Sequence, residues 1–246
     1  MPYKALLESK VTPFLETERF KHFKNPILSE KYYENYISYK EQPVLDMLTS
    51  DLAYLAQEQT AYPSDYAMIF LAENVSLDQE IREYLEHEGF ALEKHVIFIA
   101  AIDDLNLSDK DIAPVTNSPL TAQTFSTYLD YDYQHNLLYG QAYADQMRAF
   151  NVQKGLALSE SIYLAMEDDQ IIGVLTAWDF GDYVEMDDFQ VEEAFRGRGI
   201  GSALQKEASK GHRYAILIAE EINRDMYQHQ AYQEVAYYWT ALRTGK

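Results

Sequence analysis

Apolar positions near the start of the chain follow a helical period. Leu45, Leu48, Leu52 and Leu55 recur at spacings of three and four residues, which places them along one face of a helix. Together with similar signals around them, this pattern predicts that residues 1–60 are mostly helical. We interpret the leucine face as core packing, because nothing in it carries chemistry.

The pattern then changes to short apolar runs separated by one amphipathic segment. Residues 66–72 predict a strand, residues 77–87 a helix that Gly89 closes, and residues 95–100 a second strand. The predicted order is therefore strand, helix, strand.

A polar stretch marked by prolines follows at 103–120, and we interpret it as a linker. It predicts two domains, an N-terminal α/β domain over 1–110 and a second domain over 120–246. An order of strand, helix, strand recurs between 67–101 and 215–242. The chain is thus either a tandem of two related domains or a chance repeat of a common arrangement.

The second domain begins with two predicted helices and continues with a predicted hairpin, a third strand and a helix–strand alternation. Their expected ranges are 121–130 and 134–150 for the helices, 161–166, 171–178 and 183–191 for the strands, then helix 199–210, strand 214–219, helix 223–230 and a last strand that ends near 242. The expected fold class is α/β of the α+β type. Its central sheet is mixed and mostly antiparallel, flanked by helices, with a smaller N-terminal α/β domain.

Charge and cysteine content narrow the chemistry. The 246 residues hold 40 Asp and Glu against 20 Lys and Arg, a formal net charge of −20. This charge repels a phosphate backbone at long range, so we expect no nucleic-acid partner and favour a cationic one. The chain has no cysteine, which excludes disulfides, thiolate zinc sites and a cysteine nucleophile.

The N-terminal residues lack the apolar core of a signal peptide, and no run approaches the roughly 20 apolar residues that span a bilayer. We therefore expect a cytoplasmic protein with no membrane association.

A glycine-rich turn joins the third strand of the second half to the next helix. It runs from Arg196 to Gly201 and reads Arg-Gly-Arg-Gly-Ile-Gly. Glycines let backbone N–H groups approach an anion, and a helix N-terminus adds unsatisfied donors and the positive end of its dipole. The turn therefore predicts a seat for a pyrophosphate. The alternative is a tight strand-to-helix connection with no ligand.

Two other nucleotide-binding motifs do not fit this turn. No Gly-Lys-Ser/Thr follows, so it is not a Walker loop, and the order Arg-x-x-Gly-x-Gly differs from the dinucleotide fingerprint. Phosphoryl transfer would also need a phosphate-reaching lysine and a metal-holding carboxylate in the loop, and neither is present there.

The turn resembles the acyl-CoA signature of the GNAT acetyltransferase superfamily, Arg/Gln-x-x-Gly-x-Gly/Ala, through Arg196, Gly199 and Gly201. The hairpin before it and the strand after it extend the resemblance over 159–243. The resemblance implies acetyl-CoA as co-substrate, with no metal. The cofactor-binding residues that it implies are Phe189, Gln190, Val191, Arg196, Gly197, Arg198, Gly199, Ile200, Gly201 and Ser202.

The resemblance also implies catalytic groups. Tyr227 matches the tyrosine proposed as general acid for the thiolate, although most of the 21 tyrosines must serve packing or the surface. Glu185, six residues before Val191, is the first choice for the base and Asp187 the second. By period-two alternation we expect both to share a strand face with Phe189 and Val191. The alternative is that these carboxylates form only an acidic rim.

The expected function is an N-acetyltransferase of the acyl-CoA N-acyltransferase class (EC 2.3.1). It would move an acetyl group from acetyl-CoA directly to a primary amine of a small molecule or peptide in a ternary complex. A backbone N–H at Val191 would meet the oxyanion. The alternative is a catalytically silent acyl-CoA-binding or dimerisation scaffold, and a homodimer is left open. Because the N-terminal half has no such turn, it could not hold CoA in the same way.

Overall fold

The computed structural model describes residues 2–245, and its contacts group the chain into two compact units. Unit 1 comprises Met1–Val96 and Val235–Lys246, and unit 2 comprises Ile97–Glu234. The last strand is therefore grouped with the N-terminal residues, whereas the predicted division into 1–110 and 120–246 placed it in the second domain. Where independently folding domains begin and end stays a prediction. Among the described residues, no helix is long and apolar enough to cross a membrane.

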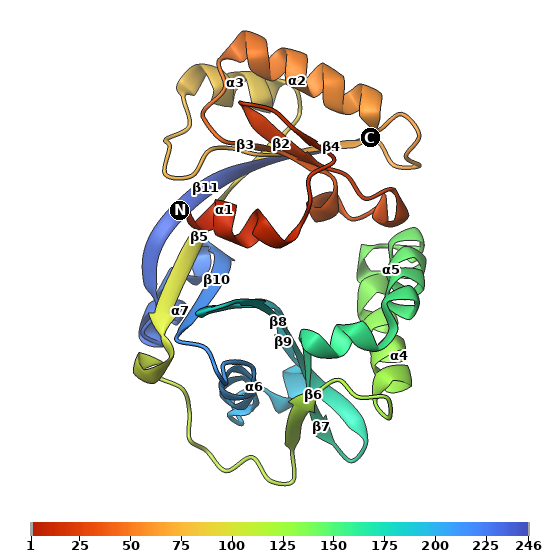
Figure 1. The fold of residues 1–246 in the computed structure, drawn as a ribbon, viewed down its shortest axis with the longest axis vertical. Coiled ribbons are helices and arrows are strands. Elements are labelled where there is room, and N and C mark those ends of the chain that lie inside the picture. Colours follow the sequence, from red (N-terminus) through yellow and green to blue (C-terminus); the bar gives the residue numbers. More distant parts are fainter. Residues whose placement is uncertain (1, 246) are drawn as a thin grey trace. The chain divides into compact units, whose positions relative to one another are not determined.

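Unit 1 is a sheet with helices packed on it (Figure 1). Its strands lie in the order β1-β2-β3-β4-β11-β5, and only β3 and β4 among its first four strands pair in parallel. The strands are β1 (Leu15–Glu16), β2 (Phe20–Phe23), β3 (Tyr36–Tyr39), β4 (Tyr66–Phe70), β11 (Gln233–Thr244) and β5 (Ala91–Ala101), of which β5 and β11 also contribute residues to unit 2. The helices are α1 (Tyr3–Leu7), α2 (Leu45–Glu58) and α3 (Gln79–His87).

The leucine face predicted near the start is confirmed. Leu48, Leu52 and Leu55 of α2 are buried against a core that includes Ile37 of β3 and Ile69 of β4. The prediction of a mostly helical start was wrong for 15–39, which holds three strands. These runs are too short to display a period, and pairing between β2 and β3 stabilises them across the chain.

Unit 2 has the strand order β5-β10-β9-β8-β7-β6, with β9 and β10 parallel and the pairs from β6 to β9 antiparallel. Its strands are β6 (Thr116–Pro119), β7 (Ile162–Glu167), β8 (Gln170–Phe180), β9 (Tyr183–Val191) and β10 (Tyr214–Glu220). Its helices are α4 (Phe125–Asn136), α5 (Gln141–Lys154), α6 (Ile200–Ala208) and α7 (Arg224–His229). Short 3₁₀ turns join several elements of both units: Glu8–Lys10, Pro26–Leu28, Tyr32–Glu34, Ile102–Asp104, Leu137–Tyr139, Gly155–Glu160, Glu193–Phe195 and Glu221–Asn223.

The predicted hairpin is confirmed as β7 and β8. Its two turn residues, Asp168 and Asp169, have φ of 49° and 63°, and the flanking Glu167 and Gln170 pair. Two consecutive positive φ angles make a type I′ turn, whose twist matches that of the strands it joins. The predicted fold class is confirmed as well, since the sheet is mixed, mostly antiparallel and flanked by helices.

The segment predicted as a linker contains a strand. β6 pairs antiparallel with β7, from Thr116 opposite Met166 to Pro119 opposite Tyr163. Its composition hides it, because Asn, Ser and Pro disfavour strands, and Pro is tolerated here because β6 lies at the edge of the sheet.

Lys4 is a buried lysine of unit 1. The Lys4 ammonium donates hydrogen bonds to Ser38 Oγ at 2.9 Å, to the Tyr39 carbonyl at 2.8 Å and to the Leu71 carbonyl at 3.0 Å. Lys4 is only 8% exposed, and burial lowers its pKa from 10.5 to about 8. Its charge is thus costly in the folded chain although all three donors are used.

Replacing Lys4 with Met should flatten the pH dependence of stability at alkaline pH. From about pH 8 to 10 the unfolded chain binds this proton and the folded chain does not, so the free energy of unfolding should rise with pH. The rise from this group is at most about 1.4 kcal/mol per pH unit. Urea unfolding across this range measures it. Lys24→Met keeps Lys4 and should keep the rise, and equal slopes for Lys4→Met and the unaltered protein would contradict the prediction.

Candidate functional site

The glycine-rich turn leads from β9 into α6, as predicted. Gly197 and Gly199 have φ of 75° and 94°, in the left-handed region that other residues rarely adopt, and Gly199 is the N-cap of α6. The first turn of α6 contains no acidic residue. Its N-terminal N–H groups therefore face no competing carboxylate of their own turn, which suits an anion.

A cavity of about 310 Å³ lies at this helix start. Eight predicted cofactor-binding residues line it: Phe189, Val191, Arg196, Gly197, Gly199, Ile200, Gly201 and Ser202. A Cβ added to Gly201 would lie 2.9 Å from Phe189 Cζ, closer than real Cβ contacts. Gly201 is thus required for the Phe189 ring to lie where it does beside the cavity.

Two predicted cofactor-binding residues do not line this cavity. The Arg198 guanidinium forms a bidentate ion pair with Glu167 of β7, at 2.6 and 3.2 Å, which lowers the pKa of that carboxyl. Gln190 pairs with Val174 in the sheet. Arg196 does line the cavity, and its Nε donates to the Val191 carbonyl at 3.0 Å. The two arginines of the turn therefore point to different surroundings.

A β-bulge divides β9 into two parts. The register with β8 shifts between Val174, opposite Gln190, and Thr176, opposite Asp187, and Asp188 has a φ of 41°. An extra residue reverses the alternation of side chains beyond it. The expectation of one shared face was therefore wrong: Phe189 reaches Gly201 of α6, whereas Glu185 and Asp187 lie on the other face.

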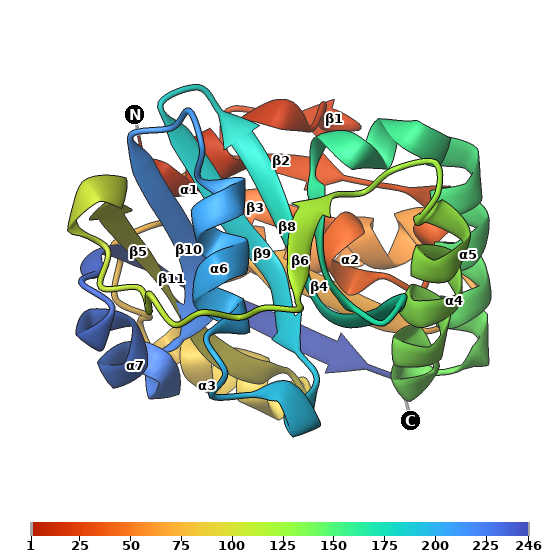
Figure 2. The same cartoon turned by 90° about the horizontal axis from the view of Figure 1, so that it is seen from below.

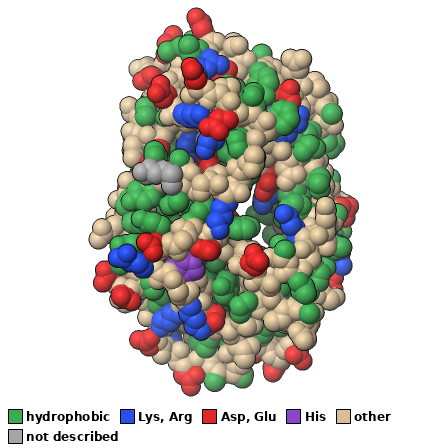
Figure 3. All heavy atoms as spheres, viewed as in Figure 1, with side chains coloured by type: hydrophobic (Ala, Val, Ile, Leu, Met, Phe, Trp, Pro, Cys, Tyr) green, Lys and Arg blue, Asp and Glu red, His purple; other side chains and the backbone are tan. Residues whose placement is uncertain are grey.

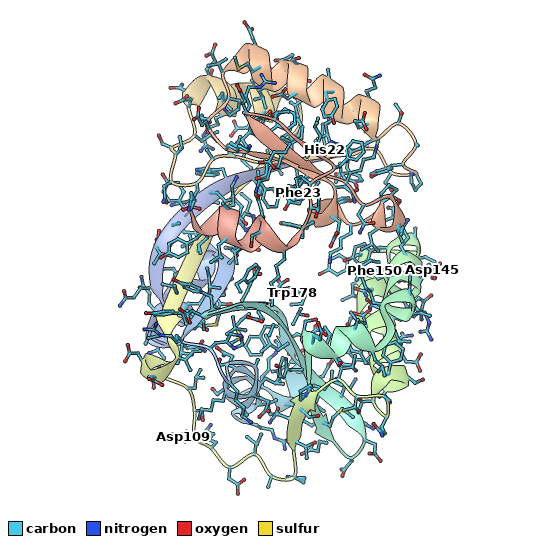
Figure 4. The ribbon with its side chains drawn as sticks, viewed as in Figure 1. His22, Phe23, Asp109, Asp145, Phe150 and Trp178 are labelled. Carbon is cyan, nitrogen blue, oxygen red and sulfur yellow. The ribbon has the colours of Figure 1, made fainter. Side chains whose placement is uncertain are left out.

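The face away from α6 carries an acidic and aromatic group. Glu185 pairs with Trp178 across the strands, and Trp178 Nε1 donates to Asp187 Oδ2 at 3.4 Å. Figure 4 shows Trp178 on this side of β8 and β9, and Asp109 on the side of α6. Burial, with the nearby charges of Asp187 and Asp188, raises the pKa of Glu185 to about 8. Trp178 is 40% exposed, so its ring is open to a ligand.

Tyr227 lies in α7 and packs beside two aromatic rings. Its ring centroid is 5.5 Å from that of Phe98 and 5.9 Å from that of Tyr232. Burial raises the pKa of its hydroxyl, which keeps Tyr227 protonated at neutral pH. Tyr227 does not line the cavity, although Gln230, three residues later, does.

The parallel pairing of β9 with β10 is short. It joins Tyr183–Tyr214, Val184–Ala215 and Glu185–Ile216, and the ladder ends there although β9 continues to Val191. Beyond the bulge, Glu192 N–H donates to the Ile172 carbonyl of β8. Since backbone groups alternate along a strand, the N–H and C=O of Val191 point away from β8, toward the side of β10.

The sequence reasoning missed five cavity residues: Ser108, Lys110, Phe195, Gln205 and Gln230. Ser108 and Lys110 fall in the segment interpreted as linker, where no local pattern marks a binding residue. Gln205 is buried and accepts a hydrogen bond from Tyr232 at 3.2 Å, so it orders the wall of the cavity. Among the described residues, no group of three or more His, Asp or Glu side chains could hold a metal ion.

Comparisons with known proteins agree with the fold. Residues 159–234 match the acetyltransferase (GNAT) domain family, and residues 7–97 match a domain of unknown function, DUF5613. No curated protein matches the chain.

Several solved structures share the fold. A functionally unknown conserved protein from Staphylococcus epidermidis has a TM-score of 0.82 at 21% identity, covering 96% of this chain and 94% of that one. A GCN5-related N-acetyltransferase from Sphaerobacter thermophilus has a TM-score of 0.59 at 12% identity, covering 92% and 76%. A tandem GNAT protein from the clavulanic acid biosynthesis pathway has a TM-score of 0.51 at 11% identity, covering 86% and 76%.

The mixed, mostly antiparallel sheet flanked by helices thus matches GNAT-like folds. More particularly, the C-terminal half of the chain, with its match at 159–234, is a domain of the GNAT superfamily. The N-terminal region fits a separate domain or a degenerate copy of the same fold.

Replacing Glu185 with Gln should stabilise the protein increasingly as pH rises from about 4.5 to 8. In that window the folded chain keeps the Glu185 proton and the unfolded chain loses it, so the free energy of unfolding of the unaltered protein falls with pH. Gln has no proton to lose. Melting temperatures at about pH 5 and pH 8.5 measure the effect. Glu193→Gln makes the same charge change at an exposed site, and an equal response of both variants would contradict a local cause.

Proposed function

We propose that the protein is an N-acetyltransferase that moves an acetyl group from acetyl-CoA to a primary amine by direct transfer in a ternary complex. The observation that carries this proposal is the cavity at the start of α6, beside the stretch of β9 that β10 does not pair with. Such a place offers donors for phosphates and strand backbone for an extended arm.

The cofactor residues suit CoA in three respects. The N–H groups at the start of α6 and the Arg196 guanidinium supply donors for a pyrophosphate. We call the turn from Arg196 to Gly201 and the start of α6 the cradle. Its glycines keep the cradle open, since a Cβ at Gly201 would displace Phe189. The Val191 backbone, which points away from β8, can pair with the pantetheine arm. Bound acetyl-CoA would supply a thioester carbonyl that is open to attack by an amine.

The acceptor amine would meet the opposite face of β9. Glu185, Asp187 and Trp178 combine negative charge with an aromatic ring, which favours a cationic small molecule or peptide. Glu185, with a pKa of about 8, can accept the proton that the amine must lose. As the C–N bond forms and the C–S bond breaks, Tyr227 can return a proton to the departing sulfur.

The alternative is a scaffold that binds acyl-CoA, or dimerises, without turnover. It is supported by the position of Tyr227, which packs beside two aromatic rings and does not line the cavity. A thiol assay distinguishes the two functions. Because the chain has no cysteine, the free thiol of CoA can be titrated with a disulfide reagent without a signal from the protein. Tight CoA binding with no thiol release on a panel of amines would favour the scaffold.

Gly201→Val should abolish the rise in melting temperature that CoA causes in the unaltered protein. Binding at about 100 times the dissociation constant stabilises a protein by about 2.7 kcal/mol, which thermal unfolding detects. The larger residue meets Phe189 and fills the cradle. Ala203→Val is the matched control, because it lies on the same helix and outside the cavity. If CoA raised the melting temperature of Gly201→Val as much as that of the unaltered protein, the cradle would not be the CoA site.

Glu185→Gln should lower kcat by about a hundredfold and remove the acidic limb of the pH–rate profile near pH 8. Asp187→Asn should mainly raise the KM of a cationic amine, because Asp187 contributes charge to the rim. It should keep the acidic limb but move it to lower pH, because the Asp187 charge helps to raise the pKa of Glu185. Tyr227→Phe should lower kcat with little change in either KM. If Glu185→Gln behaved as Asp187→Asn does, both carboxylates would be a rim and neither a base.

A further inference from the structure

A segment outside the glycine-rich turn also forms part of the cavity. We call residues 105–112 the strap. In the sequence they lie between β5 and β6, and in space they pass from beside the end of α7 to beside the start of α6 (Figure 2). Asn106 N donates to the Gln230 carbonyl and Asn106 Nδ2 to the His229 carbonyl, both at 3.2 Å. Ser108 N donates to Ser202 Oγ at 3.0 Å. The strap is therefore hydrogen-bonded to both walls of the cavity.

The strap approaches the cradle closely. A Cβ added to Gly199 would lie 3.2 Å from Lys110 Cβ and 3.4 Å from Ser108 Oγ. A glycine suits position 199 for two reasons. Its φ of 94° is rarely adopted by other residues, and a side chain there would contact the strap. Lys206 of α6 anchors the same segment, since its ammonium donates to the Ser108 carbonyl at 2.9 Å and pairs with Asp109.

Two of the cationic side chains near the cradle are already paired with carboxylates. Arg198 is paired with Glu167, and Lys206 with Asp109. The described residues that line the cavity include two cations, Arg196 and Lys110. Lys110 Nζ donates to the Gly197 carbonyl at 2.8 Å, so its ammonium is positioned at the turn itself. On a chain of net charge −20, an anion at this site depends on these local cations.

We propose that Lys110 is a phosphate ligand of the cofactor, contributed by the strap from outside the GNAT match at 159–234. This inference rests on the proposed CoA site. An ammonium has three donors, so Lys110 can keep the Gly197 carbonyl and donate a charge-assisted bond to a phosphate. The strap then closes the cavity on the side of α6, and the phosphate site is built from three segments: the turn, α6 and the strap.

The test compares CoA with 3′-dephospho-CoA, by calorimetric titration of the full chain. Lys110→Met should weaken CoA binding roughly tenfold or more, as expected for a lost charge-assisted bond. The loss should shrink at high salt, where charge interactions are screened. If the loss persists with 3′-dephospho-CoA, Lys110 contacts the pyrophosphate. If the loss is confined to CoA, it contacts the 3′-phosphate.

Two variants separate this role from a general charge effect. Lys110→Arg keeps the charge and should retain most of the affinity. Lys154→Met removes a charge at the end of α5, outside the cavity, and should bind CoA as the unaltered protein does. Equal CoA affinity of Lys110→Met and the unaltered protein would overturn the role of Lys110 alone. No CoA binding by the unaltered protein would overturn the proposed function and this inference together.

Discussion

The bulge in β9 is the constraint on which the arrangement of unit 2 depends. A regular strand would present Glu185, Asp187 and Phe189 on one face, so that the carboxylates and the anion cradle would lie together. The extra residue at Asp188 reverses the alternation, and Phe189 and Val191 turn toward α6 while Glu185 and Asp187 remain on the other face. The proposed anionic cofactor and cationic acceptor would thereby lie on opposite sides of one strand.

The local charge differs between the two faces of β9. Asp and Glu side chains are spread over the face shown in Figure 3, with Lys and Arg among them, in keeping with a net charge of −20. A phosphate can bind such a chain only where local donors outweigh the overall field. At the start of α6 the positive end of the helix dipole lies beside Arg196 and Lys110, and two carboxylates of neighbouring segments, Glu167 and Asp109, are paired with Arg198 and Lys206. On the other face, burial, together with the nearby charges of Asp187 and Asp188, raises the pKa of Glu185 to about 8.

Local patterns predicted much of unit 2. The turn at Asp168 and Asp169, the strand that ends at Val191 and the helix that starts after Gly199 are encoded within a few residues each. What could not be predicted depends on contacts between distant segments. The bulge at Asp188 appears only through the register with β8, and β6 exists because β7 pairs with it. Lys110 lies almost ninety residues from Gly197, whose carbonyl it contacts, so no spacing rule could link the two.

The same reasoning explains why unit 1 differs from unit 2 although their elements follow a similar order. β3, α2, β4 and α3 succeed one another as β9, α6, β10 and α7 do, and β3 pairs with β4 in parallel as β9 does with β10. The connection from β3 to α2 contains no glycine. Pro43 has no N–H to donate, and Asp46 places a carboxylate in the first turn of α2. A phosphate at the start of α2 would meet this negative charge, whereas the first turn of α6 contains no acidic residue, so of these two helix starts the start of α6 is the better suited to an anion.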